Sequence, residues 1–305
     1  MKLNIKGKRL GVAYVTFAAM LWGGLPIYSK YAYIYGSDPI TAAAMRSYIA
    51  ALFFIIWFLI DGTFKKINLK DVPFYLLYGL IAFGGTSLFY MTSVKMLSTS
   101  MAVMLLYTSP AFVVILSRIF YKEPITKLKF IALMCTFIGC FLAVRGYSLS
   151  TLAINLKGII IGLASGLCYS MTTVMGKLAK TKYSGKTNAG LLIIFGMSIY
   201  LIISPPWKMS MPSLPQWAAY LGLAILGTVL AYMFYLKGLE TELDGGLASI
   251  MATTEPIVAT LLSCLLFRDV LEIIQIIGIM IVILGVILPI IVDRNKVSKH
   301  IKSAK

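Results

Sequence analysis

Ten long apolar stretches, separated by short polar links, dominate the pattern of this chain. They run near residues 10–34, 39–60, 72–95, 98–119, 128–146, 157–178, 188–206, 216–237, 246–267 and 272–292. A helix needs about 20 mostly apolar residues to cross a bilayer, and backbone groups left unpaired in lipid are costly. The pattern therefore predicts an all-α integral membrane protein with ten transmembrane helices.

Composition agrees with this interpretation and excludes several classes of protein. Hydrophobic residues make up 59% of the chain and charged residues 13%, whereas soluble domains carry about 25% charged residues. The net charge of +17 would suggest nucleic acid in a soluble protein, but here the basic residues lie in links and tails. The first apolar stretch is too long for the core of a cleaved signal peptide.

The distribution of basic residues predicts the orientation in the membrane. If the N-terminus is cytoplasmic, 21 Lys and Arg residues fall on the cytoplasmic side and six on the other, with Arg46 inside a span. Cytoplasmic segments carry the excess of Lys and Arg. We therefore expect both termini in the cytoplasm, an even number of spans, and a prokaryotic plasma (inner) membrane.

The chain lacks the residue patterns of a membrane enzyme, a metalloprotein or an ATP-driven pump. The four cysteines lie inside apolar runs, and the one histidine, His300, lies in the basic C-terminal tail. Neither HExxH nor GxxxxGK[ST] occurs in the sequence. We therefore predict no catalytic residue, no metal site, no cofactor and no nucleic-acid partner.

The two halves of the chain repeat each other. The segment from Tyr107 to Pro110 corresponds to 253–256 at an offset of 146, and Trp22 corresponds to Tyr169 at an offset of 147. Each half holds an odd number of spans, five, so the second half must enter the membrane from the opposite side. The sequence thus predicts two inverted five-helix repeats, residues 1–147 and 148–305, an architecture typical of secondary transporters.

These residues resemble the EamA-type repeat of the drug/metabolite transporter superfamily. In 96–144 and 238–288, a polar link precedes a proline-containing helix, an acidic residue and a glycine-containing apolar helix. Trp22-Gly23 is similar to the start of the same repeat, and Pro39 followed by Arg46 resembles its second helix. The resemblance covers nearly the whole chain. It implies a transporter of amino acids, other small metabolites, nucleotide sugars or drugs, with spans 5 and 10 outside a central cavity.

Polar and aromatic side chains at helical spacing mark the spans expected to line that cavity. Any one of them could instead join helices to each other, since hydroxyl groups often bond across membrane helices. The residues predicted to bind substrate or line the pathway are Trp22, Arg46, Thr86, Tyr90, Tyr107, Tyr169, Thr173, Tyr232, Tyr235, Thr254 and Glu255. Tyr31, Tyr33 and Tyr35 are interpreted as an interfacial aromatic belt.

Two charged residues lie within predicted spans. Glu255 is near the middle of span 9, where a carboxylate should face the interior of the bundle. It could bind a cationic group, carry a coupling proton, or make a structural hydrogen bond. Arg46 could bind a substrate carboxylate or extend to the membrane interface. Together they could hold a zwitterion such as an amino acid.

Two further pairs of repeat equivalents remain open to more than one interpretation. Pro110 and Pro256 predict either hinges or static kinks. Glu123 and Asp269 are expected to cap the next helix or to form an interfacial ion pair.

We therefore predict a secondary transporter that moves a small polar metabolite, an amino acid or a related compound, out of the cell by alternating access. Protons are a candidate coupling ion, the lipid bilayer is the surrounding partner, and the protein is expected to be a monomer or a homodimer. The alternative is a membrane channel or a sensory membrane protein without coupled transport.

Overall fold

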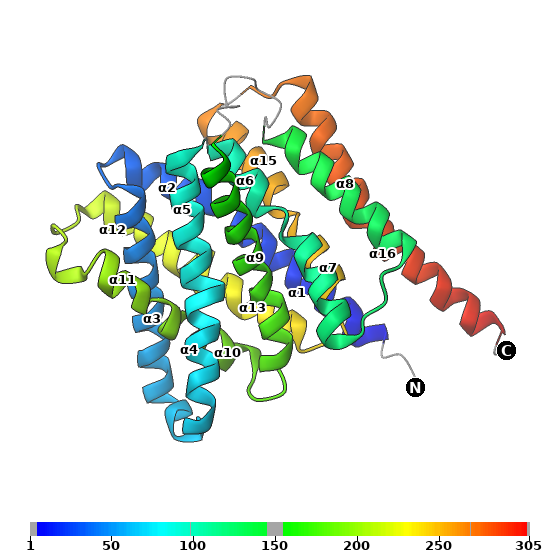
Figure 1. Ribbon diagram of the computed structural model, residues 1–305, viewed down its shortest axis with the longest axis horizontal. Coiled ribbons are helices and arrows are strands. Elements are labelled where there is room, and N and C mark those ends of the chain that lie inside the picture. The colour runs from blue at the N-terminus through cyan, green and yellow to red at the C-terminus, as the bar shows by residue number, and fades with distance from the viewer. Residues whose placement is uncertain (1–4, 98, 145–154, 269, 304–305) are drawn as a thin grey trace.

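The computed structural model describes residues 5–97, 99–144, 155–268 and 270–303, and no strand occurs in these ranges (Figure 1). The first half holds α1 (Ile5–Gly23), α2 (Leu25–Ile34), α3 (Pro39–Ile60), α4 (Val72–Tyr78), α5 (Thr86–Met96), α6 (Thr99–Leu106), α7 (Ser109–Tyr121) and α8 (Lys127–Ala143). The second holds α9 (Leu156–Ala179), α10 (Gly185–Gly196), α11 (Ser198–Ile203), α12 (Leu214–Leu221), α13 (Ala231–Leu239), α14 (Gly245–Ala252), α15 (Glu255–Phe267) and α16 (Ile273–Ser303). The predicted boundary at 147/148 lies outside the described residues.

Eight helical segments of the described chain are long and apolar enough to cross a membrane. They are Gly7–Ile34, Pro39–Ile60, Leu69–Met96, Met101–Tyr121, Leu156–Ala179, Gly185–Lys208, Leu214–Leu239 and Gly245–Phe267. The apolar part of α16, Ile273–Pro289, is shorter, and α8 has 17 residues. The chain is thus a multi-pass membrane protein, while the count of ten spans stays a prediction.

Besides the predicted span that breaks at Met197, between α10 and α11, three of the predicted helices are broken near a proline. In each, one helix ends and a second begins just before a proline: α1 and α2 meet at Gly24, α6 and α7 at 107–108, and α14 and α15 at 253–254. Pro26, Pro110 and Pro256 each occupy the first turn of the new helix. Proline fits there because it has no backbone N–H to donate. Each of these spans is thus a pair of half-helices, and the choice between a hinge and a static kink at Pro110 and Pro256 stays a prediction.

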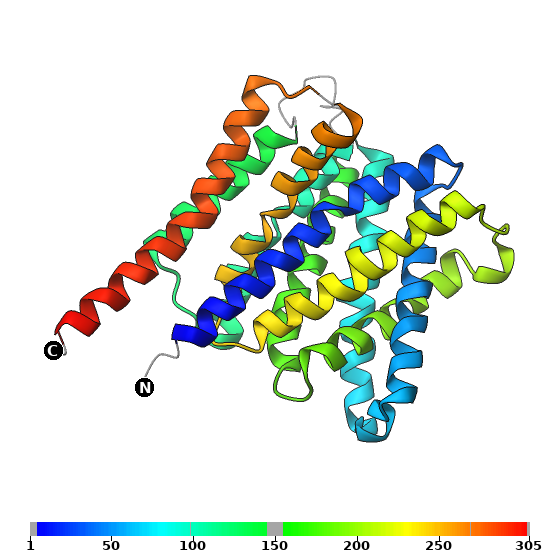
Figure 2. The ribbon, with the colours of Figure 1, turned by 180° about the vertical axis from the view of Figure 1, so that it is seen from behind.

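The contacts between the two halves occur in equivalent pairs. The first helix of each half packs on the third helix of the other, so α1 lies along α13 and α9 lies along α5. Likewise α1 contacts α14 and α15, and α9 contacts α6 and α7. Figure 2 shows α1 beside the α12–α13 segment. The third helices also share a π-helical stretch, Gly79–Gly85 in one half and Gly222–Leu230 in the other.

One between-half contact depends on two glycines that bring backbones together. A Cβ atom on Gly79 would lie 2.5 Å from the backbone nitrogen of Gly196, and one on Gly196 would lie 2.7 Å from the carbonyl oxygen of Gly79. Contacts this short involve backbone on both sides, so a methyl group can be accommodated only if the helices separate. Small residues serve this purpose in membrane bundles.

We expect Gly79→Ala to lower the thermal unfolding temperature of the purified protein in detergent, because overpacking costs about 1–3 kcal/mol. The matched control is Gly24→Ala, where the nearest atoms to an added Cβ lie at 3.3 Å and include a movable tyrosine ring. Equal unfolding temperatures for the two variants would contradict the close approach.

Helices α8 and α16 pack along each other at the edge of the bundle and touch the other helices little (Figures 1 and 2). Their outward faces are apolar and exposed, with Ile131 and Ile138 on α8 and Ile277 and Leu284 on α16. These faces are suited to contact lipid. The structure therefore puts the fifth span and the apolar part of α16 at the outside of the bundle, as the family resemblance implied.

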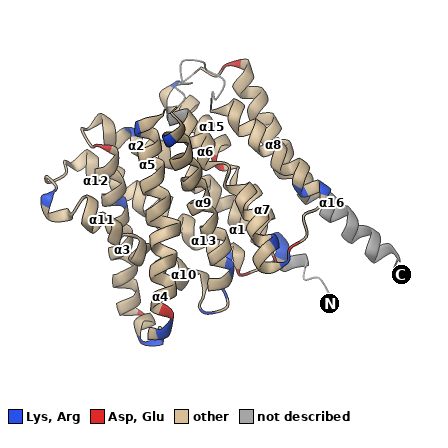
Figure 3. Cartoon of the chain, viewed as in Figure 1, with Lys and Arg blue, Asp and Glu red and all other residues tan. Residues whose placement is uncertain are grey.

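The two ends of the molecule differ in charge. The first residues of α1 and the last of α16 lie at one end, here called the termini end, and the turn between α2 and α3 lies at the other. Segments that carry Lys and Arg residues are more numerous at the termini end (Figure 3). There Lys186 pairs with Asp61 at 2.5 Å, and hydrogen bonds from Lys186 and Thr63 lower the pKa of Asp61 to about 2. The Asp61 carboxyl therefore stays ionised at neutral pH.

Candidate functional site

A cavity of about 470 Å³ lies between the two halves. Its rim includes the exposed residues Pro26, Lys30 and Pro39, so it reaches the surface at the α2–α3 end. Eight predicted pathway residues line it: Trp22, Arg46, Thr86, Tyr90, Tyr107, Tyr169, Tyr232 and Glu255. These side chains come from both halves of the chain.

Trp22 is the centre of the aromatic wall of this cavity. It is the penultimate residue of α1, two residues before the break at Gly24, and only 3% of its surface is exposed. Its ring lies 6.0 Å from that of Tyr169, 5.3 Å from that of Tyr232 and 5.1 Å from that of Tyr235. Such distances are typical of favourable aromatic pairs. The wall is therefore rigid and apolar, with phenol hydroxyls at its edges.

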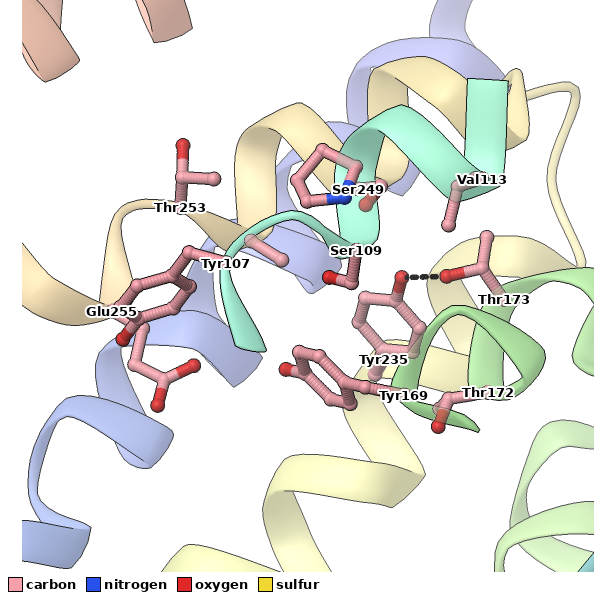
Figure 4. Close-up of a pocket in the computed structure, with 12 residues that line it drawn as sticks. Tyr107, Ser109, Val113, Tyr169, Thr172, Thr173, Tyr235, Ser249, Thr253 and Glu255 are labelled. Atoms are coloured by element: carbon pink, nitrogen blue, oxygen red, sulfur yellow. Dashed lines mark hydrogen bonds between the residues drawn. The ribbon is translucent and has the colours of Figure 1, made fainter. Parts of the chain in front are cut away.

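Glu255 lies where the large cavity ends. It is the first residue of α15, and with Tyr107 and Tyr169 it lines both the large cavity and a second space of about 10 Å³. Tyr107 and Tyr169 lie close enough to Glu255 for their hydroxyls to interact with its carboxylate. In Figure 4 the three residues stand together on one side of the small space. They form a floor between the two cavities, and the space below has room for about one water molecule.

Below the floor the path is closed by side-chain contacts. The hydroxyls of Thr173 and Tyr235 lie 2.5 Å apart and form a hydrogen bond (Figure 4). The small space is also lined by Ser109, the repeat equivalent of Glu255, and by Ser249. Thr173 and Tyr235, both predicted pathway residues, thus lie beyond the floor. The cavity therefore leads to one face of the protein in this conformation.

Arg46 brings a positive charge to the same cavity from the second turn of α3. Its guanidinium carbon lies 5.6 Å from the centre of the Phe83 ring, and its buried Nε has no hydrogen-bond partner among the described residues. No carboxylate of the described chain forms an ion pair with it, although it attracts Glu255 across the cavity. A buried donor without a partner is costly, so this site is suited to receive an acceptor from a ligand.

The structure differs from the predictions at several residues. Thr254 lines neither cavity, and its hydroxyl donates to the carbonyl of Met251 at 2.8 Å across the helix break. Tyr33, which was expected in an interfacial belt, lines the large cavity. Lys30 was missed as a cavity residue, and its Nζ lies 3.5 Å from the centre of the Phe267 ring at the rim.

Phe83 was also missed. Its position three residues before Thr86 on the same helical face is the signal that could have identified it. Pro256 lines the large cavity and Pro110 the small one, and hinge motion at these residues stays a prediction.

Comparison with known proteins adds information at the level of the family. A model described as the EamA-like transporter family matches residues 9–145 and 156–291. The chain is 25% identical over 269 residues to the uncharacterized transporter YyaM of Bacillus subtilis (strain 168), covering 85% of this chain and 86% of that protein. It is 25% identical over 281 residues to an uncharacterized transporter of Archaeoglobus fulgidus, covering 92% and 96%.

A solved crystal structure shares this fold. It has a TM-score of 0.81, covers 93% of this chain and 98% of its own, and is 16% identical in sequence. The likeness extends over both halves, including the segments that carry the cavity.

Proposed function

The chain belongs to the EamA-like transporter family, and on that premise we propose that it is a secondary transporter. It moves a small polar metabolite, an amino acid or a related compound, across the plasma membrane by alternating access. In this proposal ten spans form two inverted repeats, and both termini lie in the cytoplasm. The larger number of segments that carry Lys and Arg at the termini end supports that orientation.

The observation that carries the proposal is the cavity that ends at a floor. A space of about 470 Å³ reaches one face of the protein, and Tyr107, Tyr169 and Glu255 separate it from the closed region beyond. A channel in its conducting form would join both faces. A carrier requires access from one side of the membrane at a time. Because the contacts between the halves occur in equivalent pairs, the two halves could exchange their conformations and so open the cavity to the other side.

The charges of the cavity support a zwitterionic substrate. Arg46 offers a positive charge and an unpaired Nε–H donor for a carboxylate, and Glu255 offers a carboxylate for an amine. The aromatic wall around Trp22 accommodates the apolar part of such a molecule. An amino acid combines these three features.

Export is the proposed direction because of competition at one residue. Glu255 can hold a proton or the amine of a substrate, but the two occupants exclude each other. Transport then exchanges protons for substrate, and an inwardly directed proton gradient drives the substrate out.

The test is uptake of a panel of amino acids and related metabolites into proteoliposomes, with and without a pH gradient across the membrane. Saturable movement that the gradient stimulates supports proton-coupled exchange. Saturable movement that ignores the gradient contradicts coupling and indicates facilitated diffusion. If no compound of the panel moves, the proposed substrate class is wrong.

A further inference from the structure

Glu123 joins three segments at the termini end. It lies in the link between α7 and α8, and its carboxylate forms an ion pair with Lys177 of α9. Both of its oxygens also accept from the backbone N–H of Gly245, at 3.2 and 3.1 Å, where α14 begins. The side chains of Glu123 and Lys177 are only 12% and 11% exposed. Its repeat equivalent, Asp269, lies outside the described residues.

This arrangement refines what the sequence indicated for Glu123. The predicted interfacial ion pair is present, but Glu123 does not cap the helix that follows it. Thr126 caps α8 by accepting from the N–H of Lys129, whereas Glu123 caps α14 of the other half. A carboxylate at a helix N-terminus is favoured by the helix dipole.

A second ion pair lies beside the first. Asp244 accepts from Lys129 of α8 at 2.5 Å and from the N–H of Leu247 in its own helix at 3.0 Å. Burial alone would raise the pKa of Asp244, but its hydrogen bonds with Lys129, Glu123 and the N–H of Leu247, together with the charge of Lys129, outweigh burial and lower the pKa. Asp244 therefore remains ionised at neutral pH, and its pair with Lys129 persists.

The start of α14 fits against its neighbours without space for a side chain. A Cβ atom on Gly245 would lie 2.8 Å from the hydroxyl oxygen of Ser117 in α7 and 3.1 Å from Cδ of Lys177. A Cβ atom on Gly246 would lie 2.9 Å from a methyl carbon of Val114. The seam between α7, α9 and α14 is therefore closed by direct contact.

This closed seam lies on the continuation of the path. Ser249, one helical turn after Gly245, lines the small space below the floor, and Thr173, one turn before Lys177, lines it too. Both ion pairs join the first half of the chain, through Glu123 and Lys129, to the second half. The path can open at the termini end only if these segments separate.

We propose that Glu123 is a gating residue, whose bonds to Lys177 and Gly245 hold the path closed at the termini end and must break for it to open there. The proposal rests on transport by alternating access. It differs from a purely structural ion pair, which would remain intact in every state of the cycle.

The test is the accessibility of two cysteine reporters in a variant whose four native cysteines are replaced. Ser249→Cys reports the space beyond the floor, and Thr86→Cys reports the large cavity. The purified protein in detergent is treated with a charged maleimide, which reaches both ends. We expect Glu123→Gln to speed labelling of Ser249→Cys by about 10-fold or more and to slow labelling of Thr86→Cys, because the population shifts between two states.

Gly245→Ala should have the same pair of effects, because its methyl group would separate the seam without changing charge. Asp61→Asn is the matched control, since it removes an exposed ion pair at the same end. Unchanged labelling at Ser249→Cys in both test variants would overturn the proposal, as would faster labelling at both reporters, which indicates general loosening. The readout needs no substrate, so its failure is distinguishable from failure of the proposed transport.

Discussion

Glu255→Gln is expected to abolish stimulation of transport by a pH gradient while the protein remains folded. Glutamine has nearly the same shape and can keep the contacts with Tyr107 and Tyr169. It cannot bind or release a proton, and it offers no charge to an amine. Removing one partner of a buried, hydrogen-bonded charge pair costs about 2–5 kcal/mol, so affinity for a cationic group should fall by about 30-fold or more.

The measurement compares initial rates in proteoliposomes with and without the gradient. Glu242→Gln is the matched control, because Glu242 is an exposed carboxylate that lines neither cavity. If the Glu255→Gln protein still responds to the gradient, Glu255 is not in the coupling path. If the Glu255→Gln protein no longer binds substrates with an amine, but the gradient still stimulates transport of other substrates, then Glu255 serves amine recognition alone.

Arg46→Ala is expected to weaken substrate binding by about 10- to 150-fold, because a hydrogen bond to a charged group contributes about 1.5–3 kcal/mol. The reason lies in the unsatisfied Nε of Arg46, which has no acceptor among the described residues. Arg46→Lys should recover only part of the affinity, since lysine keeps the charge but loses the planar pair of donors.

Equilibrium binding of a substrate identified by the panel measures this effect directly. Arg118→Ala is the control, because Arg118 is exposed at the termini end, donates to the carbonyl of Lys122 and lines neither cavity. Equal affinity for Arg46→Ala and wild type would exclude a carboxylate contact at this residue. A transported compound that lacks a carboxylate should bind to the Arg46→Ala and Arg46→Lys proteins with the same affinity as to the wild type.

The family and the polarity of the spans could be recognised in the sequence because both depend on local pattern. Apolar runs of sufficient length determine the helices, and equivalent residues such as Trp22 and Tyr169 recur at nearly constant offsets. Eight of the predicted pathway residues line the large cavity for the same reason, since helical spacing places polar side chains on one face.

The remaining features depend on contacts that sequence spacing does not encode. A proline in an apolar run is compatible with a kink or with the start of a new helix, and the difference is set by the neighbouring helices. Thr254 could not be distinguished from Thr253 in the sequence, because both hydroxyls donate to a carbonyl three residues earlier, yet only Thr253 lines the small space. The bond between Glu123 and Gly245 joins residues 122 positions apart.

The equivalent contacts between the halves have a consequence for biosynthesis. Helix α1 packs mainly on α13, α14 and α15. Helices α5, α6 and α7 each pack mainly on α9. When the ribosome has completed the first half, most of the surfaces that this half will bury still have no partner. We therefore expect the newly made first half to bury these surfaces only when the second half is inserted beside it. An ancestral single-repeat protein with these same interfaces could have been stable only as a dimer.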